Sequence, residues 1–293
     1  MKLLRTAAFA LIFTVCAVSS SYAIVGAGFH WGFDFSMDMK DNGMDAVYSV
    51  KDLPFSLPAE INIDADIPFL YISRENWKRS VINFGGKAYI DIIPVIEAIE
   101  LSCNFGLWQY DGMLNYLDIK NYDPANPKYE SVPLGLDDID GLKYFSLGGT
   151  PYAKFHLDLS IRKKLFALPG DVMKFNAGAG ASAHFATPLL SSNLITDVLS
   201  AGDIESLASG DISEKKLNDL SKAIIEKIID GLAKPAFGMH ILLGTQFKLP
   251  VLPLGLYVDG KFMIPFTKFE DSDAGEDLKG MGFLINTGIS LSF

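Results

Sequence analysis

Four histidines have the side chains best suited to chemistry near neutral pH: His30, His156, His184 and His240. Each falls on a polar position of a segment in which polar and apolar residues alternate. His184 and His240 lie near the outer ends of consecutive predicted strands, so they could bind a transition metal, or one could act as a general base. Two imidazoles supply too few ligands for a convincing metal site. We therefore favour histidines that fill a polar interior, and we expect no metal site and no cofactor.

A second candidate is the acidic stretch DDID, with Asp137, Asp138 and Asp140. These carboxylates could bind calcium or serve as acids in hydrolysis. The calcium-loop spacing with its later glutamate is absent, so a solvated acidic loop is the favoured interpretation. Because no catalytic motif accompanies either candidate, we predict a protein that is not an enzyme.

The histidines belong to segments with a strict period of two. In the first mature segment, Val25, Phe29 and Phe33 alternate with His30 and Asp34. Seven further segments behave alike, at 82–92, 99–107, 153–162, 173–185, 239–247, 254–266 and 283–293, and two weaker ones lie at 44–50 and 59–71. The apolar positions carry no Asp, Glu, Lys or Arg, whereas the opposite positions often do. Such long strands with one uncharged face suit a tilted membrane crossing better than a soluble β-sandwich.

The connections fall into two classes that alternate along the chain. Short connections carry proline, at 52–59, 92–98, 166–171 and 249–255. The others are 41–43, 73–77 and three longer loops at 113–148, 187–235 and 267–280. We therefore expect an all-β fold, an antiparallel transmembrane β-barrel of ten strands, with eight or twelve as alternatives. If 44–50 and 59–71 form an external excursion, eight strands remain.

The polar faces mix both signs of charge. Acidic Asp34, Asp91, Asp158 and Asp259 accompany basic Lys87, Lys154, Arg162, Lys174 and Lys261. A barrel of this size has little room beyond its side chains. We expect an interior filled by ion pairs, and an open general porin is disfavoured.

The first 23 residues read as a secretory signal peptide. Lys2 and Arg5 precede a short apolar run, and Ser21-Tyr22-Ala23 resembles a cleavage site. Removal of Met1–Ala23 would leave Cys103 as the only cysteine and exclude an intramolecular disulfide. The formal net charge of the full chain, -10, argues against nucleic acid as a partner. Residues 24–293 are expected to form a single barrel domain with a helical insertion at about 188–235.

The chain closes on NTGISLSF, in which Asn286, Gly288, Leu291 and Phe293 form a pattern. This pattern resembles the C-terminal assembly signal of Gram-negative outer membrane β-barrel proteins. The resemblance implies recognition by the barrel assembly machinery and insertion into the outer membrane, in contact with lipid and lipopolysaccharide. Some ten-stranded barrels of this class are proteases, which would need histidine and acidic residues at the outer rim. The last strand is expected to pair with the first.

The segment 187–235 has the periodicity of a helix. Ser213 can cap a helix whose apolar stripe includes Leu217, Leu220, Ile224 and Ile228, and Gly231 marks its end. A partner helix is predicted at 189–199. The favoured interpretation is an external cap. A plug or gate is the alternative, because Gly178, Gly180 and Ser182 face the interior in the preceding strand and leave room for a helix.

These patterns favour an integral outer membrane barrel with a structural, anchoring or surface-interaction role. The second hypothesis is a narrow or gated transporter of small or hydrophobic molecules, and a surface hydrolase at the barrel rim is the third. The ligand and the oligomeric state are left open by the sequence.

Overall fold

The computed structural model describes most of the chain, as residues 25–35, 42–55, 63–78, 83–90, 98–135, 149–169, 172–210, 212–231, 235–249, 252–267 and 282–292. The expected signal peptide, the DDID carboxylates and Phe293 lie outside these residues. Within the part that the structure describes, no helix is both long and apolar enough to cross a membrane.

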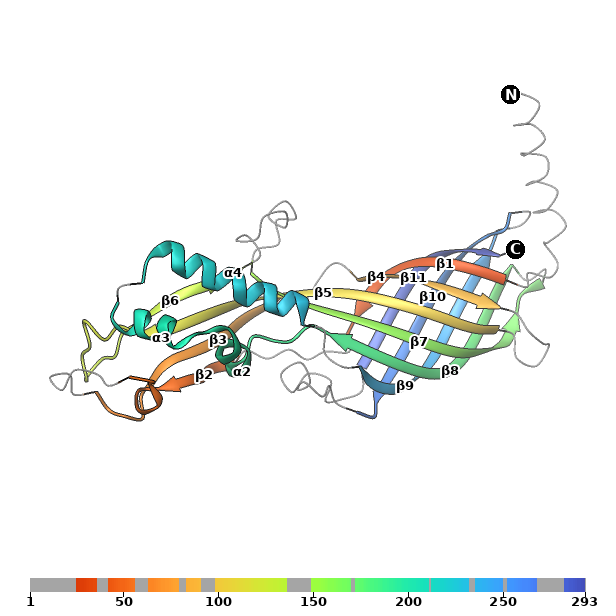
Figure 1. Cartoon of the computed structure of the whole chain (residues 1–293). Coiled ribbons are helices and arrows are strands. Elements are labelled where there is room, and N and C mark those ends of the chain that lie inside the picture. Colours follow the sequence, from red (N-terminus) through yellow and green to blue (C-terminus); the bar gives the residue numbers. More distant parts are fainter. Residues whose placement is uncertain are drawn as a thin grey trace, which may run out of the picture.

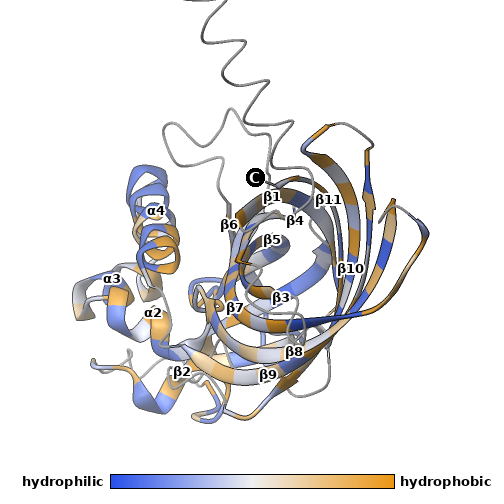
Figure 2. Cartoon of the chain, turned by 90° about the vertical axis from the view of Figure 1, so that its right-hand side faces the viewer, coloured by the Kyte–Doolittle hydropathy of each residue, from blue (hydrophilic) through white to orange (hydrophobic). Residues whose placement is uncertain are grey.

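Eight antiparallel strands close into a barrel, namely β1 (Val25–Asp34), β4 (Asn83–Ile90), β5 (Ala98–Leu117), β7 (Thr150–Ala167), β8 (Met173–Ala186), β9 (Ala236–Lys248), β10 (Leu254–Pro265) and β11 (Gly282–Ser292). They pair in that order, and β11 pairs back with β1 from Gly26↔Ser292 to Asp34↔Leu284. Figure 2 looks along this ring of strands. The predicted pairing of the last strand with the first is therefore confirmed, and it removes the two sheet edges.

The alternation of the sequence becomes the two faces of the barrel. Outward side chains are large and apolar, with Phe29, Trp31 and Leu159 each more than half exposed. Inward neighbours are polar and nearly inaccessible, as are His30, Asp158 and Ser160. This distribution is the reverse of a soluble protein and is the one that a lipid environment stabilises.

Strand β5 is long enough to belong to two structures. Its 20 residues span roughly 65 Å at the rise of an extended strand. The first part pairs with β4 and β7 in the barrel, from Ala98 to Tyr110. Beyond it, β5 pairs with β3 (Pro68–Lys78) and β6 (Tyr129–Leu134), while β2 (Asn42–Ser49) adds to β3. The result is a sheet of order β2-β3-β5-β6 that projects from one end of the barrel (Figure 1).

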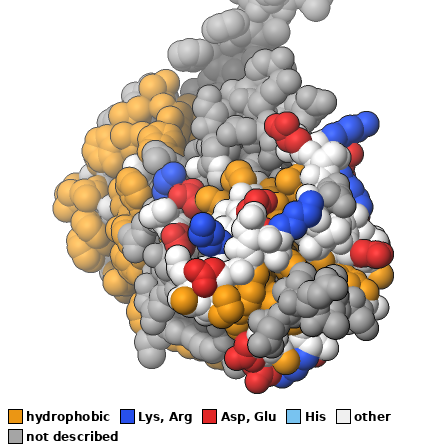
Figure 3. All heavy atoms as spheres, turned by 90° about the vertical axis from the view of Figure 1, so that its left-hand side faces the viewer, with side chains coloured by type: hydrophobic (Ala, Val, Ile, Leu, Met, Phe, Trp, Pro, Cys, Tyr) orange, Lys and Arg blue, Asp and Glu red, His pale blue; other side chains and the backbone are white. Residues whose placement is uncertain are grey.

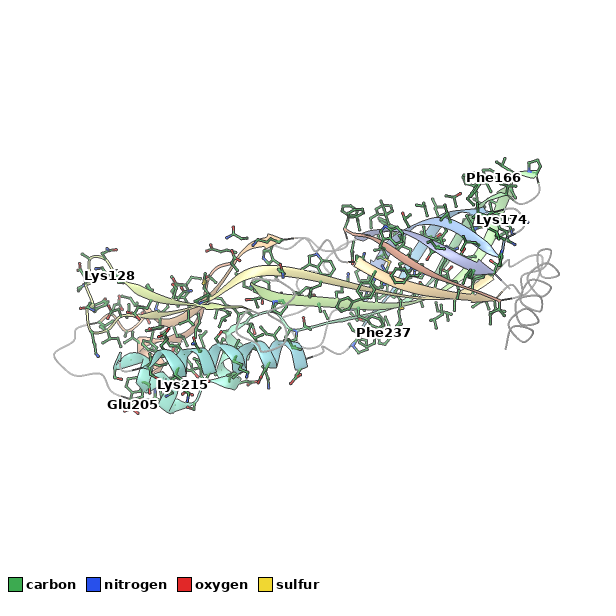
Figure 4. The ribbon with its side chains drawn as sticks, turned by 90° about the horizontal axis from the view of Figure 1, so that it is seen from above. Lys128, Phe166, Lys174, Glu205, Lys215 and Phe237 are labelled. Carbon is green, nitrogen blue, oxygen red and sulfur yellow. The ribbon has the colours of Figure 1, made fainter. Side chains whose placement is uncertain are left out.

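Three helices cover one face of this outer sheet: α2 (Ser192–Val198), α3 (Ala201–Ala208) and α4 (Glu214–Asp230). Each begins at a serine whose hydroxyl accepts a backbone N–H: Ser191 from Leu194, Ser200 from Asp203 and Ser213 from Lys216. Helix α4 thus begins and ends where the sequence predicts, since Gly231 follows its last residue. The helices lie along one side of the strands in Figure 4. We call the outer sheet, its loops and these helices the outer module.

The outer module has a hydrophobic core of its own. Its buried side chains come from the sheet and from the helices, and include Leu70, Ile72, Leu114, Leu134, Leu190, Ile195, Leu207, Ile224 and Ile228. The same cluster continues through Trp108, Tyr110 and Tyr152 to the end of the barrel. Packing against a protein core therefore fixes the module onto the barrel without a flexible linker.

The barrel has eight strands, and the expectation of ten is wrong. Strand β2 lies where the 44–50 pattern predicts a strand, and β3 overlaps the end of the 59–71 pattern, but both belong to the outer sheet. The alternative of an external excursion is the correct one. Alternation of polar and apolar residues indicates that one face of a strand is apolar. That face can pack against a protein core as well as against lipid.

Two predicted connections are also wrong. Residues 73–77 lie inside β3, and 113–148 begins with the outer part of β5 and contains β6. The segment 52–59, predicted as a short connection between barrel strands, belongs to the outer module instead, since its described part begins with the last residue of the 3-10 helix η2 (Val50–Asp52). These errors share one cause, because strands of the outer sheet were counted as membrane crossings.

Candidate functional site

The outer surface of the barrel carries two bands of phenylalanine. On β8 the bands are marked by Phe175 and Phe185, and on β9 by Phe237 and Phe247, each pair ten residues apart. At the strand rise and tilt of such barrels, ten residues correspond to a height of roughly 25 Å. That height equals the apolar band of outer-membrane barrels, which aromatic girdles flank on both sides.

Strand β7 repeats the spacing with one extra residue. Phe155 contacts Phe185 in the upper band, with ring centroids 6.0 Å apart, and Phe166 stacks on Phe175 in the lower band at 4.3 Å. The ladder slips between Lys164 and Phe166, and this bulge brings Phe166 level with Phe175. The phenylalanines of β7 and β8 therefore pair directly in the ladder, and those of β9 lie two register positions away from them.

The interior of the barrel is filled by ion pairs. Lys87 Nζ lies 2.7 Å from Asp259 Oδ2 and 3.4 Å from Glu100 Oε2, and Arg162 joins the same two acids at 2.5 and 3.2 Å. The Lys87 ammonium also lies 3.4 Å from the centroid of the Tyr257 ring. Each of these charged side chains is buried, so only its partners compensate for the loss of hydration.

A second group of charges lies nearer the outer module. Lys261 Nζ donates to Asp158 Oδ2 at 2.6 Å and to Ser102 Oγ at 2.5 Å, and Lys154 lies 3.5 Å from Asp34. The interior cations Lys87, Lys154, Arg162 and Lys261 thus face the anions Asp34, Glu100, Asp158 and Asp259. The expected filled interior is what the structure contains. Asp91 lies outside the described residues.

The four histidines take part in this interior network. His30 bonds to Tyr257 and Asn104, and His240 bonds to Ser160 and Ser182 at 2.8 Å each. His184 does not approach His240, because its register partner on β9 is Ala236, whereas His240 pairs with Gly180. The neighbour of His184 is His156, whose ring centroid lies 5.5 Å away. Sequence reasoning missed this pair because strand numbering does not reveal register.

Neither histidine candidate forms a metal or rim site. His184 and His240 are 2% and 0% exposed, inside the barrel. The nearest acid to His240 is the interior Asp158, at 4.0 Å. Over the described residues, no three His, Cys, Asp or Glu side chains are arranged to hold a metal ion.

The interior glycines of β8 make room for side chains of the barrel. A Cβ at Gly180 would lie 2.8 Å from His240 Cε1, and one at Gly178 would lie 3.4 Å from Arg162 Cγ. The space that suggested an approaching helix is therefore occupied by His240 and Arg162, and that argument for a plug is wrong. A small barrel has little interior room, so a large polar side chain fits beside a neighbouring strand that carries glycine at the paired position.

Helix α4 lies outside the barrel. It contacts β6, α2 and the end of β7. Leu220, Ile224 and Ile228 are buried in the module core, and Leu217 packs partly against it. The predicted stripe thus faces the outer sheet, whose strand β6 the sequence did not reveal.

Four aromatic rings, those of Trp77, Trp108, Tyr110 and Tyr152, pack together where the module core reaches the end of the barrel. The Trp77 ring lies 4.3 Å from Tyr110 and 6.5 Å from Tyr152, and Trp108 lies 6.1 Å from Tyr152. The Leu190 backbone N–H donates to the Tyr110 hydroxyl at 2.9 Å, which ties the segment before α2 to this group. These rings pack where β5 and β7 pass from the barrel into the module.

The residues of the terminal pattern are split between the two faces of β11. Asn286 points inward and bonds to Asn104 at 3.1 Å, whereas Leu291 is 41% exposed on the lipid side. Gly288 faces the interior, where a Cβ would lie 2.7 Å from the Tyr257 ring. Recognition of this strand by the barrel assembly machinery stays a prediction.

None of the three described helices packs on the second face of the outer sheet, although Ser73 and Asn115 on it are only 8% and 5% exposed. Register places nine described side chains of β3, β5 and β6 together on it: Tyr71, Ser73, Glu75, Asp111, Met113, Asn115, Tyr129, Ser131 and Pro133. We call this surface the free face. Burial, and then the Glu75 carboxylate, raises the pKa of Tyr71, and burial raises that of Tyr129. Both hydroxyls therefore remain protonated donors at neutral pH.

Comparison with known proteins gives a likeness of structure. No family model matches the chain. No curated protein matches it. Among solved structures, the chain is similar to the crystal structure of Neisserial surface protein A, over 92% of this chain and 96% of that one, with 8% sequence identity and a TM-score of 0.37.

The membrane assignment rests on the geometry of the chain itself. A closed antiparallel barrel, apolar outside and polar inside, with two aromatic bands, is the architecture of outer-membrane β-barrels. The resemblance that the terminal strand suggests therefore extends to the fold.

Proposed function

We propose that the protein is an integral outer-membrane barrel that anchors the outer module at the cell surface, for a structural or surface-interaction role without catalysis. The observation that carries this proposal is β5, which runs unbroken from the membrane belt into the middle of the outer sheet. Segments between β1 and β4, β5 and β7, and β8 and β9 fold together into that module. A barrel that needed only to span a membrane would have no use for such a body.

The topology supports an extracellular position for the module. Strand β1 begins and β11 ends at the end of the barrel away from the module (Figure 1). In bacterial barrels the chain ends and short turns are periplasmic and the long connections extracellular. The module would then face the outside, beyond the lipopolysaccharide leaflet.

Transport is the second candidate, and the interior argues against it. A gated transporter needs a continuous lumen beneath the 187–235 loop. Here paired charges fill the barrel, which argues against such a lumen. A rim hydrolase is supported less, because His184 and His240 are buried.

The partners follow from the same proposal. Lipid and lipopolysaccharide would contact the aromatic belt, and the barrel assembly machinery would read the terminal strand. The described side chains at the end of the module mix acidic and basic groups (Figure 3), which argues against nucleic acid as a partner.

Cysteine labelling of intact Gram-negative cells tests the orientation. In a Cys103→Ser background, Lys215→Cys and Lys128→Cys place thiols on the module, and Lys174→Cys places one at the opposite end (Figure 4). We expect a membrane-impermeant maleimide to label the module positions on intact cells and position 174 only after permeabilisation. Labelling in the opposite pattern would refute surface presentation.

A further inference from the structure

Lys163 of β7 places a charge on the lipid-facing side of the barrel. It follows Leu159 and Ile161 on the same side of the strand, both 53% exposed, and it is exposed itself. Over the described residues that pair within the barrel, no other Asp, Glu, Lys or Arg lies on an outward position. A cation in this row needs a physical reason, because the outward positions otherwise meet hydrocarbon.

The height of Lys163 corresponds to the border of the apolar band. Lys163 pairs with Ala177 on β8, two residues from Phe175 of the lower phenylalanine band. Two residues of a tilted strand correspond to roughly 5 Å. The flexible four-carbon stem of lysine can span this depth, so the ammonium group reaches the level of the lipid headgroups.

The rim around Lys163 carries further positive charge. Lys164 is exposed next to it, where the β7–β8 ladder slips. Lys174 lies at the end of the barrel away from the module (Figure 4), and Lys248 lies near the end of β9. The described residues at this end of the three strands, 161–169, 172–177 and 244–249, contain no Asp or Glu. Over its described part, this rim is therefore basic and favours an anionic ligand.

An apolar track leads from the middle of the barrel to Lys163. The outward side chains of β8 between its two phenylalanines are all alanines, at positions 177, 179, 181 and 183. Their ladder neighbours are larger, namely Leu157, Leu159 and Ile161 on β7 and Met239, Ile241 and Leu243 on β9. The surface is therefore lower along β8 than on either side, between strands roughly 10 Å apart. We call these four residues the alanine row.

The continuity of the two features selects the ligand. The alanine row alone would accept any apolar chain, and the lysines alone would attract any anion. Because Ala177 lies directly opposite Lys163, the surface suits a molecule that carries an apolar chain and an anionic group together. A second copy of the chain is disfavoured, since a two-fold interface would bring the two Lys163 side chains to the same height, where like charges repel.

We propose that Lys163, Lys164 and the alanine row bind an anionic phospholipid. The phosphate meets the two ammonium groups, and one acyl chain lies along the alanine row. This inference rests on the proposed function, because a module outside the cell puts the opposite rim in the inner, phospholipid leaflet of the outer membrane.

Native mass spectrometry of the full chain, folded in a zwitterionic detergent, tests the inference. The probes are dioleoyl phosphatidylglycerol, dioleoyl phosphatidylcholine with the same acyl chains, and glycerol 3-phosphate, which has the charge without the chains. Lys163→Gln removes the central charge, and Ala179→Phe fills the alanine row. Lys215→Gln is the matched control, because it removes the same charge at an exposed position of the module. Each variant is first shown to be folded by its heat-dependent gel shift.

We expect phosphatidylglycerol to bind more tightly than phosphatidylcholine, and Lys163→Gln to weaken its binding by about fivefold. Ala179→Phe should weaken it as well, and Lys215→Gln should bind as the wild type does. Equal affinity for the two lipids, unchanged binding in Lys163→Gln or Ala179→Phe, an equal loss in Lys215→Gln, or glycerol 3-phosphate binding as tightly as the lipid would overturn the inference. The cysteine labelling above is independent, so surface presentation can stand when lipid binding fails.

Discussion

At the scale of single residues, the interior of the barrel is governed by the requirement that buried charges keep their partners. Asp259 satisfies two cations at once, Lys87 at 2.7 Å and Arg162 at 2.5 Å. Removing one member of such a group leaves the others buried without compensation, which costs far more than the net value of the pair.

Asp259→Ala should accordingly destabilise the barrel by about 3–5 kcal/mol. The matched control is Asp66→Ala, which removes the exposed partner of Lys51 and should leave stability unchanged. Guanidinium unfolding in lipid vesicles measures the free energy of unfolding of both variants. Equal losses of stability in the two variants would contradict the burial of the interior ion pairs.

The glycines of β8 give a second prediction at this scale. Gly180→Val places side-chain atoms against His240 and the Leu159 carbonyl, and overpacking of this kind costs about 1–3 kcal/mol or more. Its neighbour Ala179 is exposed on the lipid side, so Ala179→Val should be tolerated. The folded fraction on an unheated gel compares the two. A well-folded Gly180→Val protein would contradict the close approach of His240 and the Leu159 carbonyl to this position.

At the scale of elements, the helices of the outer module depend on their first turns. Helix α3 begins with a capping box between Ser200 and Asp203, and Lys216 of α4 lies 3.0 Å from the Asp203 carboxylate. Burial acts to raise the pKa of Asp203, but the bonds from Ser200 and Lys216 outweigh it and hold that pKa below its usual value.

A lowered folded pKa contributes stability above the unfolded pKa of about 3.9, and this contribution disappears as pH falls through the folded value. Asp203→Asn should therefore lower the urea midpoint of the helical circular-dichroism signal at pH 7. The difference from wild type should shrink as the pH falls below about 4. A constant difference across this range would contradict the role of the charge.

At the scale of the whole molecule, the chain is a filled membrane barrel continuous with a packed outer body. The interior charges pair with one another across β1, β4, β5, β7 and β10, and none of these pairs involves a helix of the module. Removing the helices should therefore not open a path through the barrel.

Planar bilayers containing the folded protein should show no discrete ion channels, and deletion of 189–232 should leave them silent. The reason is that the ion pairs fill the barrel independently of the helices. Channels that widen on deletion would support the gated transporter. Insertion of each form is checked by protection of the barrel from protease.

The three tryptophans test the membrane belt directly. Trp31 is 53% exposed on the lipid side of β1, whereas Trp108 is 5% exposed within the module core. Brominated lipids should quench the fluorescence of a variant that keeps only Trp31, and leave one that keeps only Trp108 largely unquenched. Equal quenching would place the outer module in the bilayer.

The sequence alone determined the alternating faces, the inward histidines and charges, the closure of the last strand on the first, and helix α4 with its Ser213 cap. The faces and the capped helix are local features, because a period of two or 3.6 and a capping serine are read from neighbouring residues. The closure follows instead from the barrel class that the terminal pattern resembles, since a closed barrel has no free edge. The notable failure came from the same rule, since β2 and β3 alternate for a protein core and not for lipid.

Only the tertiary structure decided register and partnership. It set His184 beside His156, placed His240 against Gly180, and joined three separate connections into one module around β5. Pairings between distant strands depend on the packing of all of them together, and no short stretch of sequence specifies them. The assembly of the outer module therefore depends on the whole fold, whereas the two faces of each barrel strand can be read from that strand alone.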